Sequence, residues 1–234
     1  MASETISPLM DLKIAAILKF STLDYPGKLS AVVFCQGCPI RCVYCHNPDF
    51  QDVEKAGSIP VDELLKFLDS RKDLLDAVVF SGGEPLMQKN ICEAIKAVKD
   101  KGFSVGIHTA GTIPAKFSQV LPIVDWVGFD IKTLFSKYET ITQISNTGDL
   151  AKQSFNMLLE SGVDYEIRTT VDSRHISSED LLEIARFLAE SGVKKWVLQE
   201  CILRYVDKDL NIPLPDEKII ASISKYIDIE ARKQ

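Results

Sequence analysis

Short apolar runs alternate along this chain with longer segments of helical periodicity. Six of the runs are nearly continuous in apolar or β-branched residues, as strands buried on both faces are. They span residues 31–34, 77–80, 103–107, 126–131, 165–171 and 195–198. Strands that alternate with helices form βα units around a parallel sheet. The pattern therefore predicts an α/β protein of six βα units.

Apolar residues between and after these runs recur at the spacing of one helix face. These stripes comprise Leu64, Leu65 and Leu68; Ile91, Ala94, Ile95 and Val98; Leu181, Leu182, Ala185 and Leu188; and Ile219, Ile220, Ile223 and Ile227. Ser177 with Asp180 marks the start of the third helix, and Asp216 marks the start of the fourth. We interpret all four stripes as faces that pack on the core.

Six βα units form either a partial (β/α)6 barrel of the TIM type or a doubly wound sheet, and periodicity does not choose between them. Both folds bind ligands at the carboxyl ends of the strands. No repeat or charged linker divides the 234 residues, a length that suits one core. We expect a single domain over 1–234, with an N-terminal extension (1–28), a barrel core (29–200) and a C-terminal segment (201–234).

Composition excludes several classes of protein. The net charge is -6, whereas binding to nucleic acid requires concentrated Lys and Arg. No apolar stretch approaches the roughly 20 residues of a membrane helix. The N-terminus, with Glu4 and Asp11, lacks the features of a secretory signal. We therefore expect a cytoplasmic protein with no nucleic-acid or membrane partner.

A cluster of cysteines directly follows the first predicted strand. Cys38, Cys42 and Cys45 have the spacing C-x3-C-x2-C, and Cys35 precedes them. Thiolates are the ligands of iron-sulfur clusters, and a short loop can wrap three of them round a cubane. Such a cubane keeps one iron without a cysteine, and that iron is free to bind a substrate or cofactor.

Two other readings of these cysteines remain open. One is a structural zinc site with Cys35 or His46 as the fourth ligand, and the other is a set of buried thiols without a metal. Structural zinc usually combines two close ligands with two distant ones, whereas these candidates share one loop. Cys35 ends an apolar run, so we interpret it as a packing residue. Cys92 and Cys201 stand alone and are expected to lie outside the metal site.

Polar groups also follow the other predicted strands. They are found in Ser81-Gly82-Gly83-Glu84-Pro85, His108-Thr109-Ala110-Gly111 and Asp130-Ile131-Lys132, and at Arg168 and Gln199. Taken singly, each has a structural explanation. The glycines suit a turn, and Asp130 and Lys132 suit an ion pair. Arg168 could form an internal ion pair, whereas a surface pair with Glu166 is disfavoured because the surrounding residues look buried. Their convergence on the same ends of different strands favours a common site.

The cysteine spacing, its place after the first strand and the Gly-Gly-Glu-Pro segment resemble the radical S-adenosylmethionine (SAM) superfamily. The resemblance covers nearly the whole chain. It implies that Cys38, Cys42 and Cys45 hold a 4Fe-4S cluster whose open iron binds SAM, and that an electron from the cluster cleaves SAM to methionine and a 5'-deoxyadenosyl radical. The protein then supplies orientation and protection from water and oxygen.

The resemblance also implies which residues contact SAM. Tyr44 matches an aromatic position near the adenine, although a loop-packing role explains it as well. Gly82, Gly83 and Glu84 match the segment that binds the SAM amino group. The residues expected at SAM are Tyr44, Asn47, Gly82, Gly83, Glu84, Thr109, Asp130, Lys132, Arg168 and Gln199.

The Asp130-x-Lys132 pair resembles glycyl-radical enzyme activases, in which Lys contacts SAM and Asp helps to bind a monovalent cation. Pyruvate formate-lyase activases have an Asp at the position of His108, and this departure puts the cation site in doubt. Arg168 matches a common SAM-contacting arginine, and Gln199 is a candidate for the ribose or adenine edge.

The head of the chain, Phe20-Ser-Thr-Leu-Asp24-Tyr-Pro-Gly-Lys28, resembles the activating proteins of anaerobic ribonucleoside-triphosphate reductase. This resemblance implies hydrogen abstraction from a backbone glycine of the large reductase subunit, with reduced flavodoxin or ferredoxin as electron donor. The reductase should dock over the cysteine loop and the strand ends. No cysteine lies between Cys45 and Gly82, so one cluster is expected.

Two alternatives stay open at this point. The first is another small radical SAM enzyme, such as a 7-carboxy-7-deazaguanine synthase, which would act on a small molecule. The second is a non-catalytic iron-sulfur or zinc module that serves as a binding protein.

Overall fold

The computed structural model describes residues 12–203 and 210–233, which form a nine-stranded sheet flanked by helices. The strands are β1 (Ile14–Ser21), β2 (Ser30–Cys35), β3 (Ala77–Gly82), β4 (Ser104–Thr109), β5 (Trp126–Asp130), β6 (Asp164–Val171), β7 (Lys195–Leu203), β8 (Leu210–Ile212) and β9 (Asp228–Arg232). The helices are α1 (Val61–Asp69), α2 (Ile91–Asp100), α3 (Pro114–Val120), α4 (Tyr138–Thr142), α5 (Thr147–Ser161), α6 (Ser178–Glu190) and α7 (Glu217–Ile223). Short 3-10 turns lie at Pro48–Phe50, Pro85–Met87, Leu121–Ile123 and Phe135–Lys137.

Strands β2 to β7 correspond to the six predicted strands, and they lie side by side in sequence order, all parallel. In a doubly wound sheet, the order of the strands across the sheet reverses at a switch point. The order β2 to β7 contains no such reversal, so that alternative is wrong. Among the described residues no ladder joins β1 to β7, β8 or β9. The fold is therefore an open, partial barrel, as predicted.

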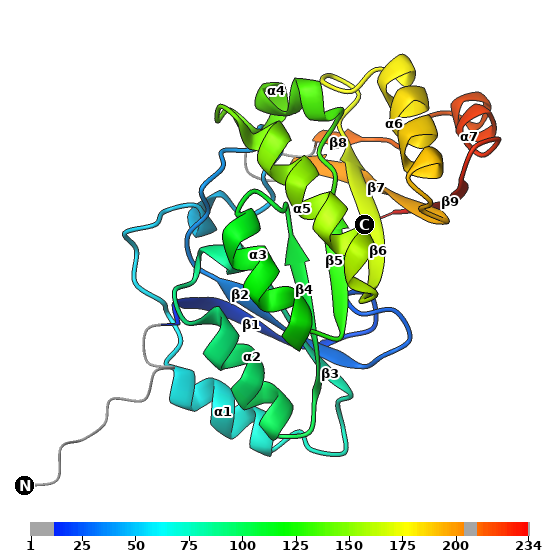
Figure 1. Cartoon of the computed structure of the whole chain (residues 1–234). Coiled ribbons are helices and arrows are strands. Elements are labelled where there is room, and N and C mark those ends of the chain that lie inside the picture. The colour runs from blue at the N-terminus through cyan, green and yellow to red at the C-terminus, as the bar shows by residue number, and fades with distance from the viewer. Residues whose placement is uncertain (1–11, 204–209, 234) are drawn as a thin grey trace, which may run out of the picture.

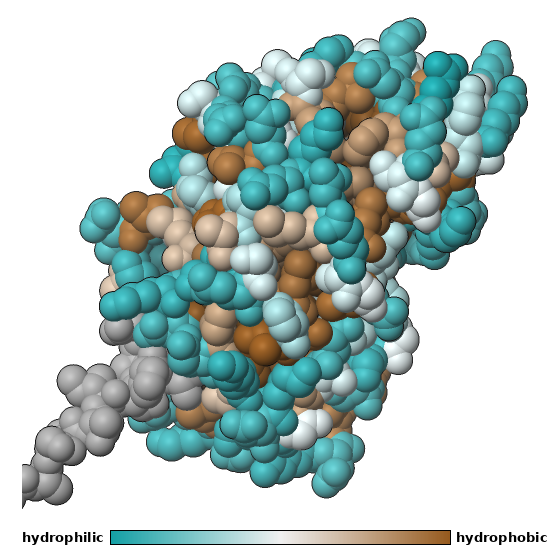
Figure 2. All heavy atoms as spheres, in the orientation of Figure 1, coloured by the Kyte–Doolittle hydropathy of each residue, from teal (hydrophilic) through white to brown (hydrophobic). Residues whose placement is uncertain are grey.

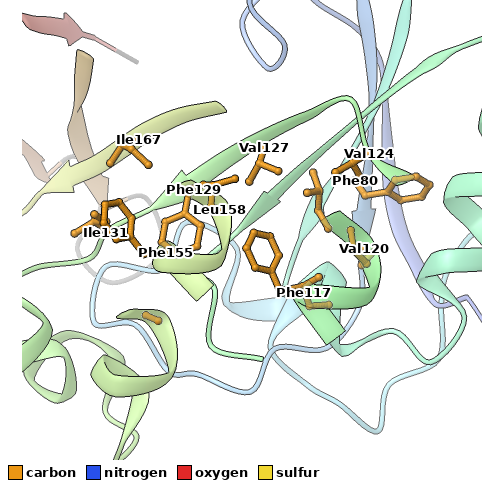
Figure 3. Packing of buried hydrophobic residues seen from close by; sticks show 14 of the residues in the cluster. Phe80, Phe117, Val120, Val124, Val127, Phe129, Ile131, Phe155, Leu158 and Ile167 are labelled. Atoms are coloured by element: carbon orange, nitrogen blue, oxygen red, sulfur yellow. The ribbon is translucent and has the colours of Figure 1, made fainter. Parts of the chain in front are cut away.

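The helices cover one face of the sheet (Figure 1) because successive parallel strands connect with the same hand. Figure 3 shows how side chains of α3 and α5 meet the sheet there. Phe129 of β5 lies between Phe117 and Phe155, with ring centroids 6.0 and 6.1 Å away. Hydrophilic side chains cover most of the outer face of the molecule (Figure 2).

The opposite, concave face of the sheet carries its own apolar residues. Alternate residues of β3 belong to different clusters: Val78 and Phe80 pack with the helices, whereas Val79 packs with Val32 and Trp126. Both faces are buried, which explains why these strands read as continuous apolar runs rather than as alternating ones.

The predicted helix stripes fall on α1, α2, α6 and α7. The start signal of α6 is confirmed as a capping box, in which the side chains of Ser177 and Asp180 each bond the other's backbone N–H. Asp216 likewise accepts from the N–H of Ile219 at the start of α7. The assignment of Ile227 to that stripe is wrong, because α7 ends at Ile223.

Three strands were absent from the sequence prediction. β1 lies within the expected N-terminal extension and pairs antiparallel with β2, and β8 and β9 both pair with β7. β1 is an edge strand whose Leu18 and Phe20 are 45% and 56% exposed, so it lacks the apolar continuity of the central strands. Within the described residues, no helix has the length and apolar character needed to cross a bilayer.

Candidate active site

A cavity of about 240 Å³ opens at the carboxyl ends of the parallel strands, and every predicted site residue lines it. These residues are Cys38, Cys42, Tyr44, Cys45, Asn47, Gly82, Gly83, Glu84, Thr109, Asp130, Lys132, Arg168 and Gln199. They come from the cysteine loop and from the ends of β3, β4, β5, β6 and β7. The structure thus brings together groups that the sequence placed on separate strands.

The cysteine loop is folded by its own backbone and by one arginine. The N–H of Gly37 donates to the carbonyl of Phe50 (2.8 Å), which closes the loop on itself. The guanidinium of Arg41 donates to the carbonyls of Cys38 (2.6 Å) and Ile40 (3.0 Å). These hydrogen bonds give the loop a defined backbone path, and its three cysteines line the cavity.

Three cysteines of the loop line the cavity, and thiolates are the ligands that an iron-sulfur cluster uses. Among the described residues, no three His, Cys, Asp or Glu side chains approach closely enough to hold one metal ion. Thiolates on one zinc ion lie about 4 Å apart. A cubane, by contrast, spreads its thiolates over different irons. The zinc alternative is not supported by this arrangement.

Burial governs the chemistry of these thiols. Burial, with a smaller contribution from the charge of Glu84, raises the pKa of Cys38 to about 12, and burial raises the pKa of Cys42 to about 11. Both groups are therefore protonated thiols at neutral pH until a metal displaces the proton. Cys35 is fully buried in the hydrophobic core, which confirms the packing interpretation, and Cys92 and Cys201 do not line the cavity.

Gly82 and Gly83 are required by the cysteine loop itself. A Cβ on Gly82 would collide with the backbone of Cys35, and a Cβ on Gly83 would collide with the carbonyl of Gly37. The loop is tied to β3 by the N–H of Gly83, which donates to the carbonyl of Cys35 (2.9 Å). The missing side chains of Gly82 and Gly83 thus allow the backbone of β3 to approach the backbone of the cysteine loop.

Glu84 connects the ends of β3 and β4. Its carboxylate is buried and accepts from the Thr109 hydroxyl (2.8 Å) and from the N–H groups of Ala110 (3.0 Å) and Leu86 (3.1 Å). Burial raises the pKa of Glu84, while these donors act in the opposite direction. Three of its roughly four acceptor positions are used within the protein, so Glu84 chiefly shapes this rim of the cavity.

A charged cluster lies on the ends of β5 and β6. Arg168 Nη2 is 2.8 Å from Asp130 Oδ1, and Lys132 Nζ is 3.1 Å from Asp130 Oδ2. Burial alone would raise the pKa of Asp130, but the charges of Arg168 and Lys132 outweigh it and hold that pKa well below its usual range. The expected Asp130–Lys132 ion pair is present. The internal ion pair that we left open for Arg168 is also present, with Asp130 as its partner, and Glu166 pairs instead with Arg232 (3.0 Å).

His108 lies beside this cluster on β4. Its Nε2 is 2.9 Å from the carbonyl oxygen of Asp24 and 3.1 Å from Arg168 Nη1. Burial and the neighbouring Arg168 charge lower the pKa of His108 to about 4, so the imidazole is neutral at pH 7.

The expected monovalent-cation site involves Asp130. Asp130 already has two cationic partners, Arg168 and Lys132, which disfavours its use as a ligand for such a cation.

The head of the chain contributes residues that sequence reasoning did not assign to the site. Asp24 lines the cavity, and its carboxylate accepts from Ser21 Oγ at 2.5 Å. The adjacent Tyr25 stacks on Trp126 with ring centroids 5.1 Å apart. The head therefore packs across the concave face and forms part of the floor of the cavity. The nearest sequence signal is Tyr25-Pro26-Gly27-Lys28, a pattern typical of a turn before a strand, which does not by itself indicate a site residue.

Comparisons with known proteins agree with this site. Residues 32–188 match the model of the radical SAM superfamily. The chain is 32% identical over 230 residues to a Methanocaldococcus jannaschii protein named as a glycyl-radical enzyme activating enzyme, covering 94% of this chain and 95% of that one. It is also 32% identical over 184 residues to a pyruvate formate-lyase-activating enzyme of Clostridium pasteurianum, covering 75% and 76% of the two chains.

The fold is also found in a solved structure. Streptococcus suis SuiB bound to S-adenosylmethionine superposes with a TM-score of 0.64 at 15% identity, over 84% of this chain and 48% of SuiB. This chain thus spans about half the length of that protein. The two activating-enzyme relatives support an enzyme of this class and thereby count against the non-catalytic alternative. The chain belongs to the radical SAM superfamily, which uses a 4Fe-4S cluster and SAM, and within it to the family of the glycyl-radical enzyme activating enzymes.

Proposed function

We propose that the protein activates the large subunit of an anaerobic ribonucleoside-triphosphate reductase by forming its glycyl radical. In this proposal Cys38, Cys42 and Cys45 hold the 4Fe-4S cluster. When bound, the cluster and SAM supply the radical chemistry. The observation that carries the proposed chemistry is the convergence of these three thiols with polar groups from five strands on one cavity.

The remaining cavity residues are proposed to bind and orient SAM. Lys132 and Arg168 provide cations for its carboxylate, and their ion pairs with Asp130 fix where those cations lie. Tyr44 is buried, its ring lies 5.9 Å from Lys132 Nζ, and its hydroxyl has no hydrogen-bond partner among the described residues. Because the ring rather than the hydroxyl is available at the cavity, Tyr44 is proposed to contact SAM through its ring. Asn47, Gly82, Gly83, Glu84, Thr109 and Gln199 complete the proposed set of contacts.

The proposed target rests on the head of the chain. Its sequence resembles the reductase activases, and its Asp24 reaches the cavity floor. A glycine Cα has no side chain to recognise, so the partner's surface must supply specificity. We propose that the reductase docks over the cysteine loop and the strand ends and delivers its glycine loop into the cavity. A small-molecule substrate is disfavoured, because relatives that match nearly the whole chain are activating enzymes.

We further propose that reduced flavodoxin or ferredoxin supplies the electron and that the protein works in the cytoplasm. All six cysteines are free in the structure, as a reducing compartment requires. The acidic net charge disfavours any role at nucleic acid.

The test is anaerobic reconstitution with iron and sulfide, followed by reductant, SAM and the candidate reductase subunit. We expect a glycyl-type EPR doublet on the reductase and formation of 5'-deoxyadenosine. A pyruvate formate-lyase subunit serves as the competing target, and the Cys42→Ala variant serves as the inactive control. A doublet on pyruvate formate-lyase alone would overturn the proposed target. A complete cluster without deoxyadenosine would overturn the proposed chemistry.

A further inference from the structure

The short helix α4 lies between the two halves of the proposed SAM site. Its inner side is buried, with Tyr138, Ile141 and Thr142 each 0% exposed, whereas Glu139 and Thr140 are exposed. In sequence it follows the Asp130–Lys132 segment, and in space it contacts the cysteine loop, which is far away along the chain. None of its residues lines the cavity. Any influence of α4 on the site must therefore pass through these two segments.

The carboxyl end of α4 is capped by the cysteine loop. The N–H of Arg41 donates to the carbonyl of Thr142 (2.8 Å), and the N–H of Val43 donates to the carbonyl of Ile141 (3.0 Å). The last carbonyls of a helix have no partner within the helix, so these two bonds satisfy groups that would otherwise be buried unpaired. The two donors flank Cys42 on either side, and α4 therefore fixes the backbone position of that cysteine.

The amino end of α4 contacts the other half of the site through one hydroxyl. The Tyr138 hydroxyl accepts from the N–H of Lys132 (3.1 Å) and donates to the carbonyl of Asp130 (3.4 Å). Burial raises the pKa of Tyr138, so the phenol stays neutral and keeps both a donor and an acceptor. One hydroxyl thus bonds the backbone on both sides of Ile131. It thereby fixes the direction in which the side chains of Asp130 and Lys132 leave the backbone.

The helix α4 also contacts the preceding 3-10 turn and the start of α5. The Tyr138 ring stacks on Phe135 with centroids 5.3 Å apart. Thr142 Oγ1 is 2.7 Å from Thr147 Oγ1 at the start of α5. A Cβ on Gly148 of α5 would collide with the carbonyl of Phe135, so α5 packs directly against the Phe135–Lys137 turn that precedes α4. These contacts leave α4 little freedom to move relative to the core.

We infer that α4 is a strut that holds the cysteine loop and the Asp130–Lys132 segment at a fixed separation, and that Tyr138 is a positioning residue for SAM binding. Tyr138 acts through the backbone of Lys132 and touches no ligand itself. The inference rests on the proposed function, because it takes Cys42 as a cluster ligand and Lys132 as a SAM contact.

The test uses Tyr138→Phe, which keeps the ring and its stacking and removes only the hydroxyl. Tyr165→Phe is the matched control, since Tyr165 is a partly exposed tyrosine of β6 that does not line the cavity. In the reconstituted, reduced full chain, SAM is titrated by its effect on the EPR spectrum of the cluster. We expect Tyr138→Phe to weaken SAM binding roughly tenfold, as loss of a positioning hydrogen bond does, with unchanged iron content. Tyr165→Phe should bind SAM like the wild type.

A second measurement separates a strut from local packing. Hydrogen exchange of the same reconstituted chain, without SAM, should be faster in Tyr138→Phe at the Lys132 amide and also at the Arg41 and Val43 amides. Thr147→Val, which loosens α4 without altering Tyr138, should accelerate exchange at Arg41 and Val43 as well. Exchange that is unchanged at Arg41 and Val43 in both variants would overturn the strut.

The SAM titration of Lys132→Met separates a failure of the positioning role of Tyr138 from a failure of the proposed SAM contact at Lys132. Weaker SAM binding in Lys132→Met together with wild-type binding in Tyr138→Phe would overturn the positioning role and leave the proposed function intact. Wild-type binding in Lys132→Met would overturn the proposed SAM contact, and the inference about Tyr138 with it.

Discussion

Asp130 and Arg168 are direct register partners on the parallel strands β5 and β6, and their side chains form an ion pair of 2.8 Å at the edge of the cavity. Gly128, two residues earlier on β5, leaves the space that Arg168 and His108 occupy, since a Cβ there would collide with both. The pair therefore depends on cross-strand register and on one missing side chain. Its energetics lead to the first prediction.

Replacement of Asp130 by Asn should leave Arg168 and Lys132 as neighbouring cations without a counter-charge. We expect the free energy of unfolding to fall by about 3 kcal/mol at pH 7, the lower end of the range for breaking a buried pair. Because the folded-state pKa of Asp130 lies below its unfolded value, the stabilisation is complete above about pH 4 and is lost as the pH falls further. Denaturant unfolding of both proteins from pH 7 to pH 3 measures this. If the difference in unfolding free energy between the two proteins stayed constant down to pH 3, the lowered pKa of Asp130 would be contradicted.

Replacement of His108 by Gln should alter the acid sensitivity of the fold. The folded-state pKa of about 4 lies below the ordinary value of 6.5, so the wild type loses stability as the pH falls from 6.5 toward 4. The expected loss from this one group is about 3 kcal/mol. His108→Gln should lose correspondingly less over the same window, as measured by urea unfolding at half-unit pH steps. Parallel pH curves for the two proteins would disprove a buried neutral imidazole.

Cys42→Ala should abolish the intact cluster, because a cubane held by two thiolates lacks a ligand on a second iron. Iron and sulfide content and the EPR spectrum of the reduced protein measure this after anaerobic reconstitution. Cys92→Ala is the control and should load like the wild type, since Cys92 lies outside the cavity. Full iron content in Cys42→Ala would remove Cys42 from the ligand set.

Gly83→Ala should prevent the cysteine loop from closing on β3, because the added methyl would meet the carbonyl of Gly37. We expect a loss of several kcal/mol in the free energy of unfolding together with poor cluster loading. Gly102→Ala is the comparison, since a methyl there meets open space and costs only the positive φ, about 1–2 kcal/mol. The temperature of thermal unfolding should rank wild type, Gly102→Ala and Gly83→Ala in descending order, whereas iron content should fall only in Gly83→Ala. Equal losses in the two variants would mean that the contact with Gly37 is relaxed easily.

Local sequence patterns were sufficient for the central sheet, and they pointed to the cysteine loop and to most of the polar groups at the strand ends. The runs that became β2 to β7 are buried on both faces, so their apolar continuity is visible without a partner. The cysteine spacing and the polar groups after each strand were informative because parallel strands bring their carboxyl ends to one edge. Edge strands carry a weaker signal. β9 contains Glu230 and Arg232, which pair with each other and also with Lys195 of β7 and Glu166 of β6.

The sequence by itself determined which residues are buried in strands, where chemistry is concentrated, and that three thiols share one loop. Only the tertiary structure decided that the sheet stays open, that Arg168 pairs with Asp130 rather than with Glu166, and that Asp24 reaches the cavity from the head. It alone showed that Tyr138 bridges the backbone of Asp130 and Lys132. Burial and periodicity are properties of a short segment and its neighbours, whereas these pairings depend on strand register and on contacts between segments that are distant along the chain.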